Sequence, residues 1–242
     1  MARSININCD MGEIQDSWDS GRDKALLGHV DAVNVCCGEH AGNHLLIEET
    51  IKYAIELGLQ IGAHPSYPDR ENFGRNVIRI SIEELKDLLK EQVSYIKNLV
   101  EKHGGKLHHV KPHGALYNEA ALNLEVAALV ADVTKEIDDN LILFGLAQSK
   151  GVAKYKELGL KVWQEVFADR TYERDGSLRN RKLEGALILE PRKAFEQVNT
   201  VLERSELVSY SGEIIEISGD SFCIHGDAEN ALEIAQFIKG EL

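Results

Sequence analysis

The chain has 242 residues, of which 43% are hydrophobic and 28% are charged, as is usual for a soluble globular protein. Its formal net charge of −13 argues against nucleic acid or an anionic membrane surface as the main partner. No apolar run approaches the length of a membrane span, and the first residues show no signal peptide.

The cysteines are Cys9, Cys36, Cys37 and Cys223, and no two of them form a CxxC pair. A structural zinc site built on cysteines is therefore not expected. A chain of this length does not need disulfides for its stability, so we predict reduced thiols and a cytoplasmic location. The vicinal pair of cysteines is interpreted as packing.

Strand-like and helix-like segments alternate along the whole chain. The predicted strands are 5–9, 32–37, 59–63, 107–110, 141–145, 161–166 and 221–224. The predicted helices are 23–29, 44–57, 82–103, 124–137, 151–158, 192–202 and 229–239, with a polar and possibly β segment before the last strand. About seven βα units predict a single-domain α/β fold over 1–242, a TIM-like barrel closed by right-handed crossovers.

Helix starts are marked by their capping residues. Asn43 is a good N-cap for the second predicted helix, and Ser81 with Glu84 forms a capping box before the third. Gly58 is a good stop for the second helix, and Pro191 suits the first turn of the helix at 192–202.

The third predicted strand runs into a loop, Gly62–Arg75, that holds two prolines and four charged residues. Similar polar loops follow five of the other predicted strands. Their ionisable residues are Asp10 with Glu13, His40, His64, Lys111 with His113, Asp169 with Arg170, and His225 with Asp227. Because the carboxyl ends of parallel strands meet at one rim of a barrel, we expect these side chains to form one catalytic or binding site.

Two metal-ligand sets can be drawn from these residues. Asp10, His64 and His113 offer a carboxylate and two imidazoles to a divalent ion. His40 and His44, four residues apart, offer a second set with Asp10. The alternative is a metal-free acid and base set around a bound amide or carboxylate.

The charged segment from Arg170 to Lys182 is either a solvated loop or an anion-binding lid. The remaining histidines, His29, His103, His108 and His109, are interpreted as surface or core residues. The sequence contains no GxxxxGK[ST] or strand–GxGxxG–helix nucleotide motif, and no GxSxG elbow.

Several ordered blocks resemble the LamB/YcsF family. They are Asn8-Cys9-Asp10-Met11-Gly12-Glu13, Val33 to Gly42, Gly62 to Arg70, Val110-Lys111-Pro112-His113-Gly114-Ala115-Leu116-Tyr117, Phe167-Ala168-Asp169-Arg170 and Ile224-His225-Gly226-Asp227. Long matches in this order are more specific than any single short motif.

The resemblance implies a distorted TIM-like barrel related to glycoside hydrolase and deacetylase barrels. It also implies ATP-dependent cleavage of 5-oxo-L-proline to L-glutamate, with two partner proteins, subunits B and C of a 5-oxoprolinase. The chain departs from the family pattern at Ile14-Gln15-Asp16, at Glu39 and at Asn43-His44. These departures lie in rim loops and affect the expected substrate more than the fold.

The implied reaction suggests roles for the rim residues. ATP can activate a lactam by phosphorylating the amide oxygen, after which water opens the ring. Lys111, Arg170 and Arg75 are then expected to bind phosphate, and Asp10, Glu13 or His64 to be the base. Mg²⁺ is expected with ATP, near Asp10 or Asp169. Without a P-loop, the ATP site is of another kind or is completed by the partners.

Two other hypotheses remain open: a metal-dependent amide hydrolase or deacetylase that needs no ATP, and a non-catalytic subunit that presents a ligand. For a rim site, we expect Asp10→Ala and Lys111→Ala to abolish turnover and to leave the melting temperature nearly unchanged.

Overall fold

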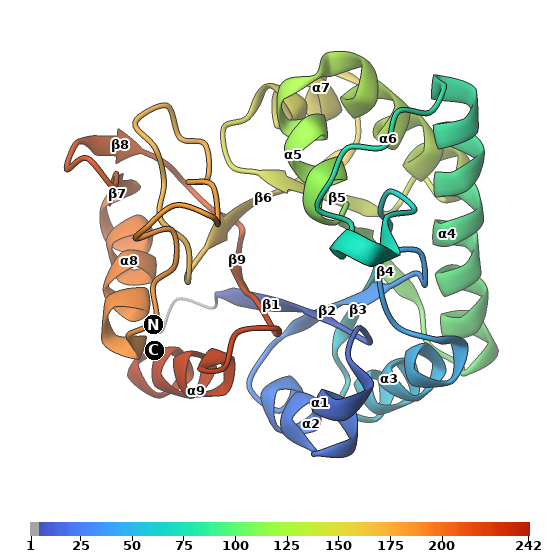
Figure 1. The fold of residues 1–242 in the computed structure, drawn as a ribbon, viewed down its shortest axis with the longest axis horizontal. Helices are drawn as coiled ribbons and strands as arrows, with labels where there is room; N and C mark the ends of the chain where they lie inside the picture. Colours follow the sequence, from blue (N-terminus) through green and yellow to red (C-terminus); the bar gives the residue numbers. More distant parts are fainter. Residues whose placement is uncertain (1–4) are drawn as a thin grey trace.

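A computed structural model describes residues 5–242, and the first four residues, where no signal peptide was expected, lie outside this range. Seven parallel strands close into a barrel in the order β1-β2-β3-β4-β5-β6-β9 (Figure 1). They are β1 (Asn6–Met11), β2 (Ala32–Cys36), β3 (Gln60–His64), β4 (Leu107–Val110), β5 (Ile142–Leu146), β6 (Lys161–Phe167) and β9 (Ser221–Ile224). The prediction of a seven-stranded α/β barrel is confirmed.

The last barrel strand closes the ring. β9 pairs in parallel with β1, where Asn6 lies opposite Ser221, and with β6, where Phe167 lies opposite Cys223. The chain between β6 and β9 forms α8 (Pro191–Arg204) and an antiparallel hairpin of β7 (Glu206–Val208) and β8 (Ile214–Glu216). This hairpin is the polar, possibly β segment of the sequence, and it lies outside the barrel (Figure 1).

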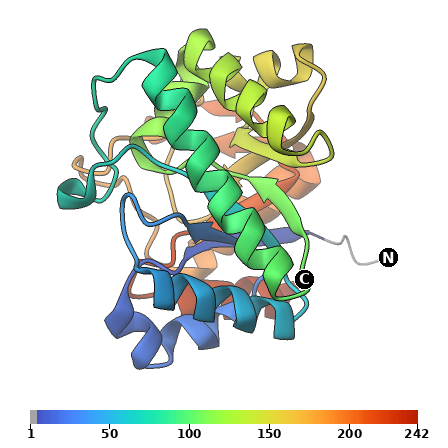
Figure 2. The ribbon, with the colours of Figure 1, turned by 90° about the vertical axis from the view of Figure 1, so that its right-hand side faces the viewer.

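Helices surround the strands, and α4 runs along the outside of the barrel (Figure 2). Seven helices lie within a few residues of their predicted bounds: α2 (Arg22–Leu27), α3 (His44–Glu56), α4 (Ile82–Lys102), α6 (Leu124–Ile137), α7 (Lys150–Glu157), α8 and α9 (Ala231–Glu241). The predicted caps are present, since Asn43 accepts from the Leu46 amide and Ser81 with Glu84 forms the capping box. No helix of residues 5–242 is long and apolar enough to cross a membrane.

Two helices were missed in the sequence. The segments of α1 (Gln15–Asp19) and α5 (Gly114–Leu122) were interpreted as loops, and a short 3-10 turn, η1 (Arg70–Asn72), lies in the long loop after β3. α5 buries Ala115, Leu116, Tyr117, Ala120 and Ala121, so its apolar residues surround the helix instead of forming one stripe. Because apolar residues lie on all sides of α5, including the exposed Leu122, the helix has no amphipathic period to detect.

The barrel interior is polar near its carboxyl end. In β1, Ile7 and Cys9 belong to the hydrophobic core shared with the helices, whereas the alternate residues Asn8 and Asp10 hydrogen-bond across the barrel. Asn34 of β2 donates to Asn8 Oδ1 at 2.8 Å and accepts from His109 Nε2 at 2.7 Å. Barrels of this kind usually fill this space with branched aliphatic side chains. The main apolar core therefore lies between the strands and the helices.

The four cysteines are all unpaired and buried. Cys9 and Cys36 belong to the hydrophobic core, while Cys223 faces the interior and accepts from Lys111 Nζ at 3.1 Å. Burial raises the pKa of each of these three thiols well above its ordinary value, so they are poor nucleophiles.

We predict that Gly62→Ala destabilises the barrel. A Cβ at this position of β3 would lie 2.1 Å from His109 Nε2, and the His109 ring is held by Asn34 and stacked on Phe144 at 4.2 Å. Such overpacking should lower the free energy of unfolding by about 1–3 kcal/mol, measured by urea denaturation.

Gly240→Ala is the matched control. Gly240 lies in α9 with no atom within 4 Å of an added Cβ, so the substitution should raise stability by roughly 0.5–1 kcal/mol. Equal stability of the two variants would contradict the close contact inside the barrel.

Candidate active site

The ionisable strand ends meet at one cavity of about 490 Å³ at the carboxyl end of the barrel. Of the expected site residues, those that line it are Asp10, Glu13, His64, Arg75, Lys111, His113, Arg170, His225 and Asp227. The other two lie directly behind the lining: His40 contacts Glu13, and Asp169 contacts His225. The structure therefore brings together all eleven expected residues.

Asp10, at the end of β1, is held at the floor of this cavity from two sides. Its Oδ1 accepts from Asn34 Nδ2 at 2.8 Å and from Lys111 Nζ at 3.1 Å, and its Oδ2 lies 3.3 Å from His64 Nε2. Burial alone would raise the pKa of Asp10, but the charges of His64 and Lys111 outweigh it and hold that pKa well below the usual range. Asp10 is therefore a fixed, ionised carboxylate with one oxygen facing the histidines.

Lys111 is an internal cation. Its side chain is 2% exposed, and Nζ contacts Glu165 Oε1 at 2.8 Å in addition to Asp10. Burial would lower the pKa of Lys111, but the nearby Asp10, Cys223 and Glu165 raise it well above its ordinary value. The ammonium is thus charged and matched by two carboxylates inside the barrel.

Backbone carbonyls determine the tautomers of His64 and His113. His64 Nδ1 lies 2.7 Å from the Lys111 carbonyl oxygen, and His113 Nε2 lies 2.9 Å from the Phe73 carbonyl oxygen. A carbonyl oxygen only accepts, so these two nitrogens carry the protons. The remaining nitrogens, His64 Nε2 and His113 Nδ1, face each other at 2.9 Å with lone pairs in the neutral rings. This arrangement needs a cation between them, either a proton or a metal ion.

Glu13 and His40 form a second pair beside the first. His40 Nε2 lies 2.9 Å from Glu13 Oε1, His40 Nδ1 lies 2.9 Å from Ser66 Oγ, and the His40 ring stacks on His113 at 3.8 Å. Burial, with the charge of Asp10, raises the pKa of Glu13 to about 8. One proton shared by Glu13 and His40 satisfies both groups, so this pair needs no ion.

Asp169 orients His225. Its Oδ1 lies 2.9 Å from His225 Nδ1, and its Oδ2 accepts from the His225 backbone amide at 2.9 Å. The His225 ring also stacks on Phe167 at 5.1 Å. Asp169 is buried behind the lining and acts on the cavity through His225.

The ligand atoms of Asp10, His64 and His113 lie within 4.8 Å of one another, as do those of Glu13, His40 and His113. His44 is not part of either group. It begins α3, its side chain is 65% exposed, and its ring contacts Tyr95 and Glu48. The structure therefore assembles the first of the two metal-ligand sets considered in the sequence and does not assemble the set with His44.

The LamB/YcsF family profile matches residues 5–242. The chain belongs to the LamB/YcsF family. A relative from Shouchella clausii (strain KSM-K16), named as the A subunit of 5-oxoprolinase, is 40% identical over 239 residues, which cover 99% of this chain and 94% of the relative. A relative of the same name from Bacillus cytotoxicus is 40% identical over 235 residues, which cover 97% of this chain and 93% of the relative.

A solved structure shows the same fold. The Lactam Utilization Protein from Thermus thermophilus superposes with a TM-score of 0.90 at 31% identity, covering 98% of this chain and 94% of that one. The family resemblance read from the sequence blocks is confirmed along the whole barrel.

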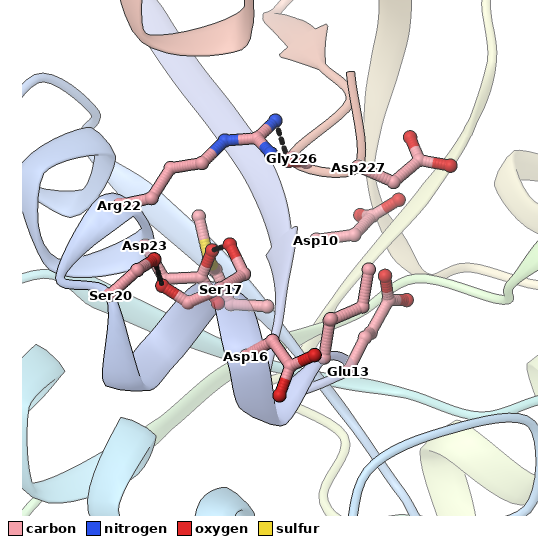
Figure 3. Close-up of a pocket in the computed structure, with 11 residues that line it drawn as sticks. Asp10, Glu13, Asp16, Ser17, Ser20, Arg22, Asp23, Gly226 and Asp227 are labelled. Atoms are coloured by element: carbon pink, nitrogen blue, oxygen red, sulfur yellow. Dashed lines mark hydrogen bonds between the residues drawn. The ribbon is translucent and has the colours of Figure 1, made fainter. Parts of the chain in front are cut away.

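Two residues of the segment where the sequence was expected to depart from the family pattern lie at the wall of an adjoining cavity. That cavity, of about 240 Å³, is lined by Ile14 and Asp16 and shares Asp10, Glu13 and Asp227 with the larger one (Figure 3). The residues Gln15 and Asp16 open α1, which forms one side of it. Ile14 and Asp16 thus lie beside the site, whereas Glu39, Asn43 and His44 line neither cavity.

Sequence reasoning missed the residues that support the site from inside the barrel. Asn34 and Glu165 have no exposed surface and contact Asp10 and Lys111, respectively. A signal was present for Asn34, because a single amide interrupts the apolar segment Ala32–Cys36. A buried polar side chain in such a strand requires a partner.

We predict that Lys111→Met lowers the free energy of unfolding by about 3–5 kcal/mol, because it leaves Glu165 and Asp10 buried without their cation. This replaces the expectation that substitution of Lys111 leaves the melting temperature nearly unchanged. Urea denaturation measures the change.

The double variant Lys111→Met/Glu165→Gln serves as the comparison, since a neutral amide removes one of the two stranded charges. It should recover part of the lost stability. A single variant as stable as the wild type would mean that Lys111 is not a matched internal charge.

Proposed function

We propose that this chain is the A subunit of an ATP-dependent 5-oxoprolinase, a hydrolase that opens the cyclic amide of 5-oxo-L-proline to give L-glutamate. The observation that carries the proposal is the convergence of Asp10, His64 and His113 on one point at the floor of the cavity. The relatives with the 5-oxoprolinase name and the solved lactam utilization protein supply the substrate class.

Ring opening needs three things from the site: an activated water, a counter-charge for the carbonyl oxygen and a proton for the leaving nitrogen. Water adds to the lactam carbonyl carbon, the C–N bond breaks, and the nitrogen leaves as the amine of glutamate. With ATP, the amide oxygen first receives the γ-phosphoryl group and ADP leaves. Water then adds, the C–N bond breaks to give an acyl phosphate, and a second water hydrolyses this acyl phosphate to the carboxylate and phosphate. The Glu13–His40 pair holds one exchangeable proton beside His113. The pair can pass this proton to the leaving nitrogen and regain one from the attacking water.

Asp10, His64 and His113 fit a divalent metal ion. Each imidazole donates its other N–H to a backbone carbonyl, which is the usual support of a metal-ligating histidine. Asp10 adds an ionised oxygen, and three protein ligands leave a position open, as in catalytic sites. When bound, such an ion supplies a Lewis acid for the amide oxygen and an activated water. The same fit favours the second candidate function, a metal-dependent amide hydrolase that acts without ATP.

We infer that the ATP step requires partner subunits. Of the three cations expected to bind phosphate, Lys111 is matched by Asp10 and Glu165, and Arg170 donates to the carbonyls of Arg179 and Ala186. Arg75 lies at the cavity mouth, 44% exposed, and its Nη2 contacts Asp227 Oδ2 at 2.6 Å. The B and C subunits of the enzyme are the proposed source of the nucleotide contacts, with Mg²⁺ bound alongside ATP.

The complete assembly of this chain with subunits B and C should convert 5-oxoproline to glutamate with release of ADP in equal amounts, whereas this chain alone should not. Asp10→Asn should lower kcat/KM by roughly 10²- to 10⁴-fold, because it removes the anion at the floor of the cavity. Asp87→Asn, an exposed change on α4, is the matched control and should have no effect.

The other readings predict different results in this assay. Glutamate formation without ADP would support the metal-dependent amide hydrolase. Tight binding of 5-oxoproline without turnover in any combination would leave a non-catalytic, ligand-presenting role for the chain.

The purified chain should bind one equivalent of Zn²⁺ or Mn²⁺, measured by calorimetry and elemental analysis. His64→Ala or His113→Ala should weaken this binding by at least about 10-fold, since each removes one of three ligands. His44→Ala is the matched control and should bind like the wild type, because His44 lies outside the group. Unchanged metal binding in His64→Ala, with an unchanged melting temperature, would leave a shared proton between His64 and His113 as the explanation.

A further inference from the structure

The cavity is much more basic than the chain that forms it. Its lining holds six basic residues, Arg75, Lys111, Arg170, Arg179, Arg181 and Lys182, against three acidic ones, Asp10, Glu13 and Asp227. The whole chain has 27 basic and 40 acidic residues. A basic cavity in an acidic protein points to an anionic ligand.

Three of these cations already have partners within the protein. Lys111 is matched inside the barrel, and Arg170 donates to backbone carbonyls. Arg179 pairs with Glu173 at 2.7 Å and stacks on Tyr210 at 3.6 Å. The cations that remain for a ligand lie at the mouth of the cavity, on the loops after β3 and β6.

Arg75 and Arg181 converge on one oxygen atom from these two loops. Arg75 Nη2 lies 2.6 Å from Asp227 Oδ2, and Arg181 Nη1 lies 3.2 Å from the same oxygen. The side chain of Arg75 is 44% exposed, that of Arg181 26% and that of Asp227 23%, so a small molecule can reach them. Two guanidinium groups share one carboxylate, which leaves one positive charge unmatched in this cluster. A second carboxylate would match it.

We propose that Arg75 and Arg181 form an anion subsite at the cavity mouth that takes the carboxylate of a small lactam. The lactam amide then faces Asp10, His64 and His113, which line the same cavity. The anion subsite stands on the contacts of Arg75 and Arg181, and its assignment to a lactam carboxylate rests on the proposed function. Asp227 holds the two guanidinium groups together and competes with the ligand for them.

Calorimetry on the purified chain tests the subsite with three probes: 5-oxo-L-proline, 2-pyrrolidinone, which is the same lactam without a carboxylate, and inorganic phosphate. Arg181→Gln and Arg75→Gln should each weaken binding of 5-oxoproline by about 10- to 100-fold, the usual effect of losing a charged hydrogen bond. Binding of 2-pyrrolidinone should change by less than about 2-fold.

Arg174→Gln is the matched control for charge and loop. Arg174 lies on the loop that carries Arg181, but its side chain is exposed and outside the cavity lining. This variant should bind all three probes like the wild type. If Arg174→Gln and Arg181→Gln lost the same affinity for 5-oxoproline, the effect would come from the overall charge of the chain. That result would overturn the subsite.

Asp227→Asn distinguishes a binding role from a structural one. It breaks the Arg181 ion pair, as Arg181→Gln does, and the Arg75 ion pair as well, but it frees both guanidinium groups for the ligand. We therefore expect 5-oxoproline to bind severalfold more tightly to Asp227→Asn. If both variants instead weaken 5-oxoproline and 2-pyrrolidinone alike, the cluster only shapes the loops and the subsite is overturned.

The remaining outcomes separate the subsite from the proposed function. If Arg181→Gln loses phosphate binding but keeps 5-oxoproline binding, the assignment to a lactam carboxylate is wrong. If the complete assembly forms glutamate and Arg181→Gln leaves its KM for 5-oxoproline unchanged, the subsite fails while the function stands. If the wild-type assembly forms no glutamate, yet Arg181→Gln and Asp227→Asn shift 5-oxoproline binding in opposite directions, the subsite stands while the function fails.

Discussion

The buried ammonium of Lys111 is the constraint on which the site depends. An ion taken out of water must be matched by opposite charge and hydrogen bonds, and here Asp10 and Glu165 supply the charge. Breaking such a group is costly, because each remaining member is then a stranded charge. Asn8 and Asn34 complete the network with their amides. The inside of this barrel is therefore a polar frame that holds one aspartate in a single position, and the apolar core is left to the interface with the helices.

The floor and the mouth of the cavity are built differently. At the floor, His64 and His113 are oriented by backbone carbonyls, which leave two lone pairs directed at each other and at Asp10. Side chains held in this way need no reorganisation when charge develops in a reaction. At the mouth, Arg75 and Arg181 are partly exposed and held only by a shared carboxylate. The first arrangement suits chemistry on an amide, and the second suits recognition of a charged ligand that must enter and leave.

Much of the site was accessible from the sequence because parallel barrels place chemistry at strand ends. His64 directly before Pro65, and His113 directly after Pro112, were found from position alone. Their partners were not. Glu165 lies in a predicted strand but gives no sign that it faces Lys111, which is 54 residues away along the chain. The buried helix α5 was missed for a related reason, since its apolar residues have no periodic stripe.

The order of strands and helices, the seven-stranded barrel and the family were determined by the sequence itself, because alternating apolar segments and polar strand ends are local patterns. Tertiary structure decided which charges are free. It placed Lys111 and Arg170 against internal partners and left Arg75 at the mouth. It also decided the tautomers of His64 and His113 through carbonyls from other loops. These outcomes depend on distances between segments far apart along the chain, which local patterns do not encode.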